Sequence, residues 1–169
     1  AIIDAHAQNN GHLNLTDASY LTALKIFLQA ISPGEYAASK GFARVGREFP
    51  GVGTQVACQM QALDEIRHAQ TQIHALSNYN KFYNGFHAFA DARDRMWYCT
   101  LPRSFFDDAM SAGPFEFMIA IGFAFEYVLT NLLFVPFMSG AAYNGDMGTM
   151  TFGFSAQSDE ARHMTLGLE

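Results

Sequence analysis

Charged residues, cysteine and clusters of basic residues are all scarce in this sequence of 169 residues. Charged residues make up 15% of it, against about 25% in a typical soluble domain. The net charge is -6 and no segment concentrates Lys and Arg, which excludes a nucleic-acid-binding surface. Cys58 and Cys99 stand alone without a CxxC spacing, which excludes a thiolate metal site or a disulfide framework and is typical of a reducing cytoplasm.

The shortage of charge leaves little surface that is suited to water. Half of the residues are hydrophobic and 16 are Phe, so we expect some helix faces to pack against other segments or subunits. The sequence has no initiator Met, no targeting peptide and no helix stop signal after Thr165. We therefore expect residues 1–169 to form one domain that is a fragment of a larger subunit.

One apolar run, from Phe117 to Met138, is long enough to span a membrane. Glu126 lies in its middle, and a carboxylate at the centre of a bilayer is costly. We expect instead a helix that is buried inside protein, with Glu126 held by a cation, and no membrane contact.

Helical periodicity runs through the sequence, and no sustained alternation of apolar and polar residues indicates a sheet. We predict an all-α fold. Thr16 is the expected N-cap of a first helix that reaches towards Arg47, and Pro33-Gly34 should kink or widen this helix just before Glu35. Further helices are expected from the Pro50-Gly51 turn to about 76, at 86–98, at 114–138 and from 149 to the end, with breaks at Pro102 and Gly113-Pro114 and a glycine-rich loop at 139–148.

The most specific feature is a pentapeptide, Asp-Glu-x-Arg-His, that occurs at 64–68 and again at 159–163. A glutamate and a histidine three residues apart lie on one face of a helix, so both can reach one metal ion. A single Glu-x-x-His is more often a pair on a helix surface than a metal site. Two copies of the whole pentapeptide favour two ions.

The positions of the turns provide a geometric test of this interpretation. Glu35 lies fifteen residues before Pro50 and Glu65 fifteen residues after it, so both sit about 22 Å from the turn at about 1.5 Å rise per residue. Glu126 and Glu160 are each seventeen residues from Tyr143, inside the second expected loop. Each antiparallel hairpin should therefore place one Glu opposite one Glu-x-x-His.

This count predicts a site of four carboxylates and two imidazoles that suits a pair of iron or manganese ions. Glu116 is a rival for the carboxylate of the fourth helix, but it lies about ten residues too early in the sequence and lacks the Tyr and hydroxyl neighbours that Glu35 and Glu126 share. Around the site, Asp64 and Asp159 should accept the second N–H of the histidine rings, and Arg67 and Arg162 should pair with these aspartates. Spacing leaves open which aspartate meets which histidine. The predicted ligands are Glu35, Glu65, His68, Glu126, Glu160 and His163.

The segments 55–61 (QVACQMQ), 64–70 (DEIRHAQ) and 154–163 (FSAQSDEARH) resemble the large hydroxylase subunit of the bacterial multicomponent monooxygenases, phenol hydroxylase in particular. The resemblance runs over essentially the whole chain. It implies a ferritin-like four-helix bundle that carries a carboxylate-bridged di-iron site, with an extra intervening helix. It also implies that iron activates O2 and that phenol is hydroxylated to catechol.

The same resemblance implies partners and further site residues. The partners are other hydroxylase subunits, a small regulatory protein, and an NADH-dependent reductase that carries FAD and a 2Fe-2S cluster. Thr130 resembles an active-site threonine that relays protons, and Asn131 and Gln157 resemble polar residues near the surface that the regulatory protein contacts. The substrate pocket implied by position is formed by Ile31, Ala38, Phe105, Phe125 and Phe134.

Two other di-iron classes remain open from the sequence. One is a ferritin-like iron-storage shell, which should have a charged surface that this sequence lacks. The other is a small subunit of ribonucleotide reductase, which makes a tyrosyl radical. Tyr36 and Tyr127 directly follow expected ligands, so the residues alone do not exclude radical chemistry.

The expected roles of His68 and Thr130 differ in a way that substitutions can separate. We predict that His68→Ala loses iron because it removes a ligand, whereas Thr130→Ala keeps iron but uses O2 poorly. Iron content and O2 consumption of the full enzyme check this prediction. Equal loss of iron in both variants would contradict it.

Overall fold

The computed structural model describes residues 4–5, 8, 17–83, 85–86 and 89–168, without the side chains of Phe89, Ala90, Leu129 and Asn131. The main elements of this part of the chain are all helices, which confirms the all-α prediction. They are α2 (Ala18–Val45), α3 (Val52–Tyr79), α4 (Phe89–Arg95), α5 (Trp97–Ser111), α6 (Pro114–Phe117), η2 (Met118–Thr130), α7 (Asn131–Tyr143) and α8 (Met147–Leu168).

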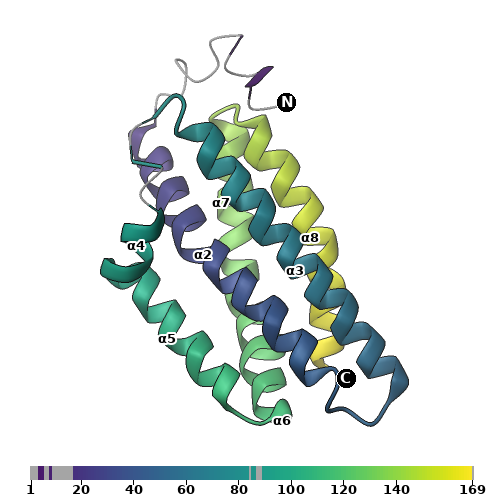
Figure 1. Cartoon of the computed structure of the whole chain (residues 1–169). Coiled ribbons are helices and arrows are strands. Elements are labelled where there is room, and N and C mark those ends of the chain that lie inside the picture. The colour runs from purple at the N-terminus through teal and green to yellow at the C-terminus, as the bar shows by residue number, and fades with distance from the viewer. Residues whose placement is uncertain (1–3, 6–7, 9–16, 84, 87–88, 169) are drawn as a thin grey trace.

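Four long helices form the bundle: α2, α3, the uninterrupted stretch from α6 through η2 to α7, and α8 (Figure 1). The helices α2 and α3 run side by side as one antiparallel hairpin, and α8 packs against η2 and α7 in the second. The short helices α4 and α5 connect the hairpins and flank α2. They correspond to the extra intervening helix that the sequence predicted.

The first helix begins one residue later than expected and does not break where expected. Asp17 is its N-cap, and the carboxylate accepts hydrogen bonds from the backbone N–H of Ser19 at 2.8 Å and of Tyr20 at 3.2 Å. Thr16, the predicted cap, lies outside the described residues. The predicted interruption at Pro33-Gly34 is wrong because α2 continues through it. A Cβ on Gly34 would lie 3.0 Å from the Phe106 ring, so this glycine allows α5 to pack closely on the helix.

The irregular helix is instead the one that carries Glu126. Residues Met118–Thr130 form a π-helix, in which hydrogen bonds reach five residues back and the helix is wider than an α-helix. The hydroxyl of Thr130 also donates five residues back, to the carbonyl of Phe125 at 3.4 Å. Wide turns of this kind are frequent at functional sites.

Two further predicted breaks are also wrong. Pro102 lies inside α5, and the expected loop at 139–148 shrinks to residues 144–146 between α7 and α8. A Cβ on Gly140 would lie 3.1 Å from the Tyr20 ring, so that glycine serves close packing within a helix. Gly145 alone occupies the turn with a positive φ of 70°, where glycine is favoured.

The core has three layers along the bundle. One apolar cluster joins the first half of α2 to the end of α3 and to α7, with Leu24, Phe27 and Phe134 at its centre. A second joins the last part of α2 to α5, α6 and η2 around Phe42 and Phe117. Between them lies a layer of buried polar side chains: Ser32, Glu35, Gln61, Glu65, His68, Gln72, Glu126, Thr130, Glu160 and His163.

The stretch Pro114–Tyr143 is long and apolar enough to cross a membrane by length and composition alone, and 31% of its most apolar window is buried in the structure. Its Glu126 is only 2% exposed and lies in the polar layer inside the bundle. Exposed apolar side chains such as Phe115, Ile119 and Leu132 follow the outer side of the same stretch.

Close packing around Gly41 should make this position sensitive to a single methyl group. A Cβ there would lie 2.1 Å from the fully buried Phe117 ring, so Gly41→Ala should destabilise the fold by about 1–3 kcal/mol. Gly53, also helical, has nothing within 4 Å, and Gly53→Ala should be neutral or up to about 1 kcal/mol stabilising. Urea unfolding of the full-length subunit checks the difference, and equal midpoints for the two variants would contradict it.

Candidate metal centre

All six side chains predicted as ligands lie together in the polar layer. Two groups of them have potential ligand atoms within 4.8 Å of one another: Glu35, Glu65, His68 and Glu160, and then Glu65, Glu126 and His163. Glu65 belongs to both groups. Each of the six is at most 7% exposed. The rival Glu116 is exposed at the start of the same helical stretch as Glu126, so it does not enter the cluster.

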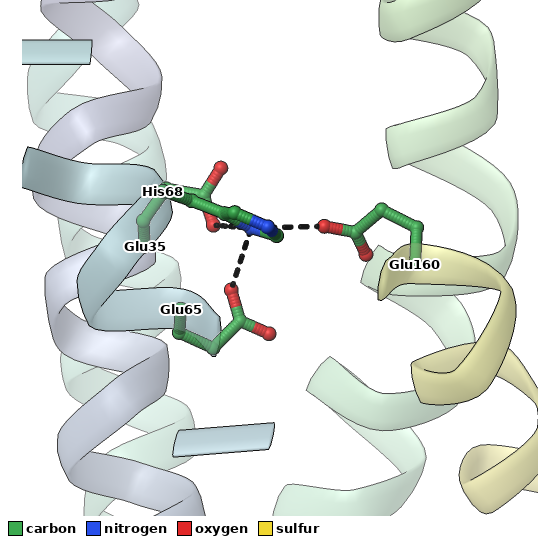
Figure 2. A group of neighbouring side chains, drawn as sticks. All are labelled: Glu35, Glu65, His68 and Glu160. Atoms are coloured by element: carbon green, nitrogen blue, oxygen red, sulfur yellow. Dashed lines mark ion pairs between the residues drawn. The ribbon is translucent and has the colours of Figure 1, made fainter. Parts of the chain in front are cut away.

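His68 lies at the centre of the first group, as Figure 2 shows. Its Nδ1 is 3.2 Å from Oε1 of Glu160 and 3.8 Å from a carboxylate oxygen of both Glu35 and Glu65. The carboxylates come from three helices, α2, α3 and α8, and all point towards the ring nitrogen. The first group therefore joins both hairpins.

His163 has the corresponding position in the second group. Its Nδ1 lies 3.2 Å from Oε1 of Glu65 and 3.2 Å from Oε2 of Glu160. The two imidazole rings are 6.0 Å apart between centroids. Both histidines thus direct Nδ1 towards the shared carboxylates, which leaves Nε2 free to bond outside the cluster.

The buried carboxylates and histidines of the cluster shift one another's pKa values. Burial, with the neighbouring Glu65 adding to it, raises the pKa of Glu35 to about 8, and burial beside Glu65 and Glu160 raises the pKa of Glu126 well above its usual range. Burial alone would lower the pKa of His68, but the carboxylates of Glu160 and Glu35 outweigh it and raise that pKa to about 11. Protons thus substitute for positive charge that the residues otherwise lack.

Two buried atoms of the cluster make no well-aligned hydrogen bond: Oε2 of Glu65, and Nδ1 of His68, which lies 3.2 Å from Glu160 as an ion pair. Within the described residues, no lysine or arginine forms an ion pair with any of the four clustered glutamates. Unpaired buried carboxylates are costly unless they coordinate a metal. The donor set of carboxylates and imidazoles fits iron or manganese and not copper or structural zinc.

The aspartates pair with the histidines of the opposite hairpin. Nε2 of His68 on α3 is 3.1 Å from Oδ2 of Asp159 on α8, and Nε2 of His163 on α8 is 3.3 Å from Oδ2 of Asp64 on α3. This crossed arrangement answers the question that spacing left open. Each ring is held by the helix across from its own, so the orientation of both rings depends on how α3 and α8 pack.

The two arginines close a ring of charges around this crossing. Arg67 donates to Asp64 at 3.0 Å and also to Asp159. Arg162 donates to Asp159 at 2.5 Å and to Asp64 at 3.1 Å. Burial would raise the pKa of Asp159, but its bonds with His68 and the arginines outweigh burial and lower it. Asp159 therefore stays ionised as the acceptor for the ring of His68.

Two glutamines of the cluster were missed in the sequence. Nε2 of Gln72 donates to Oε1 of Glu35 at 2.8 Å, and Nε2 of Gln61 donates to Oε1 of Glu65 at 3.2 Å. A signal was available: Gln61 lies four residues before Glu65 and Gln72 four residues after His68, on the same helical face. Both glutamines are buried and orient carboxylates within the polar layer.

The other predicted site residues lie in different surroundings. Thr130 is buried and follows Glu126 by four residues on the π-helix. Gln157 is half-buried on α8, one turn before the second pentapeptide's Glu160. Asn131 begins α7, and its side chain lies outside the described residues.

The five predicted pocket residues do not share one cluster. Ile31 and Phe134 belong to the first apolar cluster and Ala38 and Phe125 to the second, on opposite sides of the polar layer. Phe105 is 38% exposed and stacks on Phe125 with ring centroids 6.2 Å apart. A cleft of about 410 Å³ does reach the centre, but between α3 and α8, where His68 and Phe152 line it.

Residues 1–169 match the family described as methane/phenol/alkene hydroxylase. The chain belongs to this family. Among hydroxylases, it is 70% identical, over all of its length, to phenol 2-monooxygenase oxygenase component DmpN of Pseudomonas sp. (strain CF600). It is 28% identical, over 86% of its length, to the methane monooxygenase component A alpha chain of Methylosinus trichosporium.

A solved hydroxylase has the same fold. The crystal structure of xenon-pressurized phenol hydroxylase from Pseudomonas sp. OX1 matches 99% of the chain with a TM-score of 0.91 and 69% identity. The chain covers 34% of that hydroxylase, 33% of DmpN and 28% of the methane monooxygenase chain. It thus spans about a third of the length of these relatives.

The crossed aspartates should matter for metal affinity. We expect Asp159→Asn and Asp64→Asn each to weaken Fe(II) binding by about 10–100-fold, because each histidine loses the charged acceptor that fixes its tautomer and raises its basicity. Asp94, which pairs with Arg103 at 3.0 Å on the surface, provides the control substitution Asp94→Asn. Anaerobic Fe(II) titration of the full-length apoenzyme measures the effect. Unchanged affinity in both site variants would show that the crossed pairs do not support the metal.

Proposed function

We propose that this chain is the metal-binding core of an aromatic monooxygenase. It holds two iron ions, and the complete enzyme hydroxylates phenol to catechol with O2. The observation that carries the proposal is the buried cluster of four glutamates and two histidines, in a chain 70% identical to a phenol 2-monooxygenase oxygenase component. Residues 1–169 are then the four-helix di-iron core of a longer hydroxylase subunit.

The two groups of side chains suggest how the ions are shared. Glu35, Glu65, His68 and Glu160 would hold one iron, and Glu65, Glu126 and His163 the other, with Glu65 common to both. Four carboxylates balance the charge of two Fe(II) ions. Metal binding would then displace the protons that Glu35 and Glu126 hold because their pKa values are raised. When bound, the iron pair supplies the redox chemistry that activates O2.

The remaining roles belong to the protein around the metal. The apolar clusters above and below the polar layer exclude water from it. In this proposal Thr130, which is buried four residues after Glu126, passes protons with its hydroxyl. Asn131 and Gln157 face the regulatory protein. The phenol pocket would lie beside the polar layer, with Ile31 and Phe134 on one side and Ala38, Phe105 and Phe125 on the other.

The proposal includes a set of partners. Electrons come from NADH through a separate reductase that carries FAD and a 2Fe-2S cluster, and other hydroxylase subunits and a small regulatory protein complete the enzyme. The chain's acidic charge and lack of a basic stripe favour no nucleic-acid partner. We place the enzyme in the cytoplasm and not in a membrane, with Glu126 engaged at the metal.

Comparison with relatives favours hydroxylation over the other di-iron classes. The matching proteins named above are hydroxylase or monooxygenase components. None of their names indicates iron storage or a tyrosyl radical.

Substitution of two glutamates on one helical stretch tests the proposal. Glu126→Gln should lower iron content and should reduce catechol formation by about a hundredfold or more, because it removes one of the proposed ligands. Glu116→Gln, in which an exposed carboxylate changes in the same way, should keep turnover within about twofold. The assay uses the complete complex with reductase, NADH, O2 and phenol.

Two results would overturn the proposal. One is the absence of ring hydroxylation by the complete complex together with a stable tyrosyl radical in electron paramagnetic resonance. The other is a full-length preparation that binds no iron after anaerobic loading with Fe(II). Equal activity of the Glu126→Gln and Glu116→Gln variants would retain the function but remove Glu126 from the site.

A further inference from the structure

A further buried carboxylate, that of Asp146, lies at the start of α8 and outside the metal cluster. Asp146 is 2% exposed and directly precedes Met147, the first residue of the helix. All four hydrogen bonds that it accepts in the described structure come from neutral groups. Its Oδ2 accepts from Tyr20 at 2.7 Å, Tyr79 at 2.5 Å and the Thr149 hydroxyl at 2.8 Å, and its Oδ1 accepts from the Thr149 N–H at 3.1 Å.

These donors belong to three different helices. Tyr20 lies in the first turn of α2, Tyr79 is the last residue of α3, and Thr149 lies in the first turn of α8. Burial and the neighbouring carboxylate raise the pKa of both phenols, so both hydroxyls remain protonated donors. Through these hydrogen bonds, Asp146 connects the start of α8 to the start of α2 and to the end of α3.

The buried face of α8 explains why such a connection is needed. Thr149, Gly153, Ala156, Glu160 and His163 form one buried stripe along this helix. The middle of the stripe is small: Gly153 has no side chain, and a Cβ there would lie 2.5 Å from Met138. Small residues permit close packing but offer few projecting groups that resist sliding or rotation of one helix on another. Polar contacts therefore stand at both ends of the stripe, at Asp146 and at the Asp159–His163 segment.

The distance along the helix makes the link to the metal site direct. Glu160 lies fourteen residues after Asp146, which is about 21 Å and close to four full turns of an α-helix. A shift of α8 by one residue would rotate its face by about 100° and turn His163 away from the cluster. A buried hydrogen-bond network with fixed donor positions resists such a shift.

We propose that Asp146 is a positioning residue that sets the register of α8 against α2 and α3, so that Glu160 and His163 reach the metal cluster. This inference rests on the proposed function, because it assumes that the cluster binds iron. The second iron group takes its only histidine from α8 and has three members, whereas the first takes only Glu160 of its four members from α8. Loss of the Asp146 network should therefore weaken the second iron more than the first.

Three variants of the full-length hydroxylase complex test the proposal. Asp146→Asn removes the charge, and Tyr79→Phe removes one donor while it keeps the ring, in case the first variant does not fold. Gln29→Met is the matched control: Gln29 is buried and donates to the Gly85 carbonyl at 3.0 Å, on α2 and away from α8. It removes a buried hydrogen bond without affecting the start of α8.

Two measurements separate positioning from a general loss of stability. In anaerobic Fe(II) titration of the apoenzyme, Asp146→Asn and Tyr79→Phe should bind the second iron about tenfold or more weakly, with a smaller loss for the first iron, which keeps Glu35, Glu65 and His68. Hydrogen exchange should become faster in residues 149–163 of these variants. Gln29→Met should leave both iron affinities and exchange in this segment unchanged, even where its melting temperature falls equally.

The outcomes distinguish this inference from the function on which it rests. If the wild type binds two irons and both network variants bind them with wild-type affinities, Asp146 does not position α8. The same conclusion follows if Gln29→Met weakens the second iron as much as the network variants do. If the wild type itself binds no iron, the proposed function fails first.

Discussion

Four carboxylates buried within one layer of the bundle are the constraint on which the rest of this structure depends. Charges about 4 Å apart repel by about 4 kcal/mol at the effective dielectric constant of a protein, and here the ligand atoms of each group lie within 4.8 Å. The two histidines and the raised pKa values of Glu35 and Glu126 relieve part of this repulsion. Two apolar clusters pack against this layer, one on each side of it along the bundle. A pair of metal ions would neutralise the charge that this packing forces together.

The repeated motif lies in surroundings that are not repeated. Gln61 and Gln72 support the carboxylates next to the first pentapeptide, whereas the equivalent positions next to the second are Ala156 and Gly167. Ser39 donates across to the Ala62 carbonyl on α3, but its counterpart Thr130 donates within its own π-helix. The two halves of the cluster therefore differ in the hydrogen bonds that support them, although their sequence motifs are nearly the same.

Sequence periodicity predicted the helices well and their interruptions poorly. Proline and glycine at 33–34, 102 and 139–143 were interpreted as breaks, yet all of these positions lie inside helices. At Gly34 and Gly140 the reason is tertiary, because each accommodates an aromatic ring from another helix. The second turn is centred near Gly145 and not at Tyr143. That error of about two residues offsets Glu126 and Glu160 from each other by about four residues, or about 6 Å, which their two long side chains can span. The predicted convergence of the six side chains is therefore still observed.

The sequence by itself determined which residues meet, because the spacing of Glu-x-x-His on a helix and the distances to each turn follow from helix geometry alone. Only the tertiary structure decided how they meet. The crossed pairing of His68 with Asp159 and of His163 with Asp64 depends on the relative placement of α3 and α8. The π-helix at Glu126 and the contacts of Asp146 depend in the same way on neighbouring helices. Local spacing carries no information about such contacts, since they form between segments that are far apart in the chain.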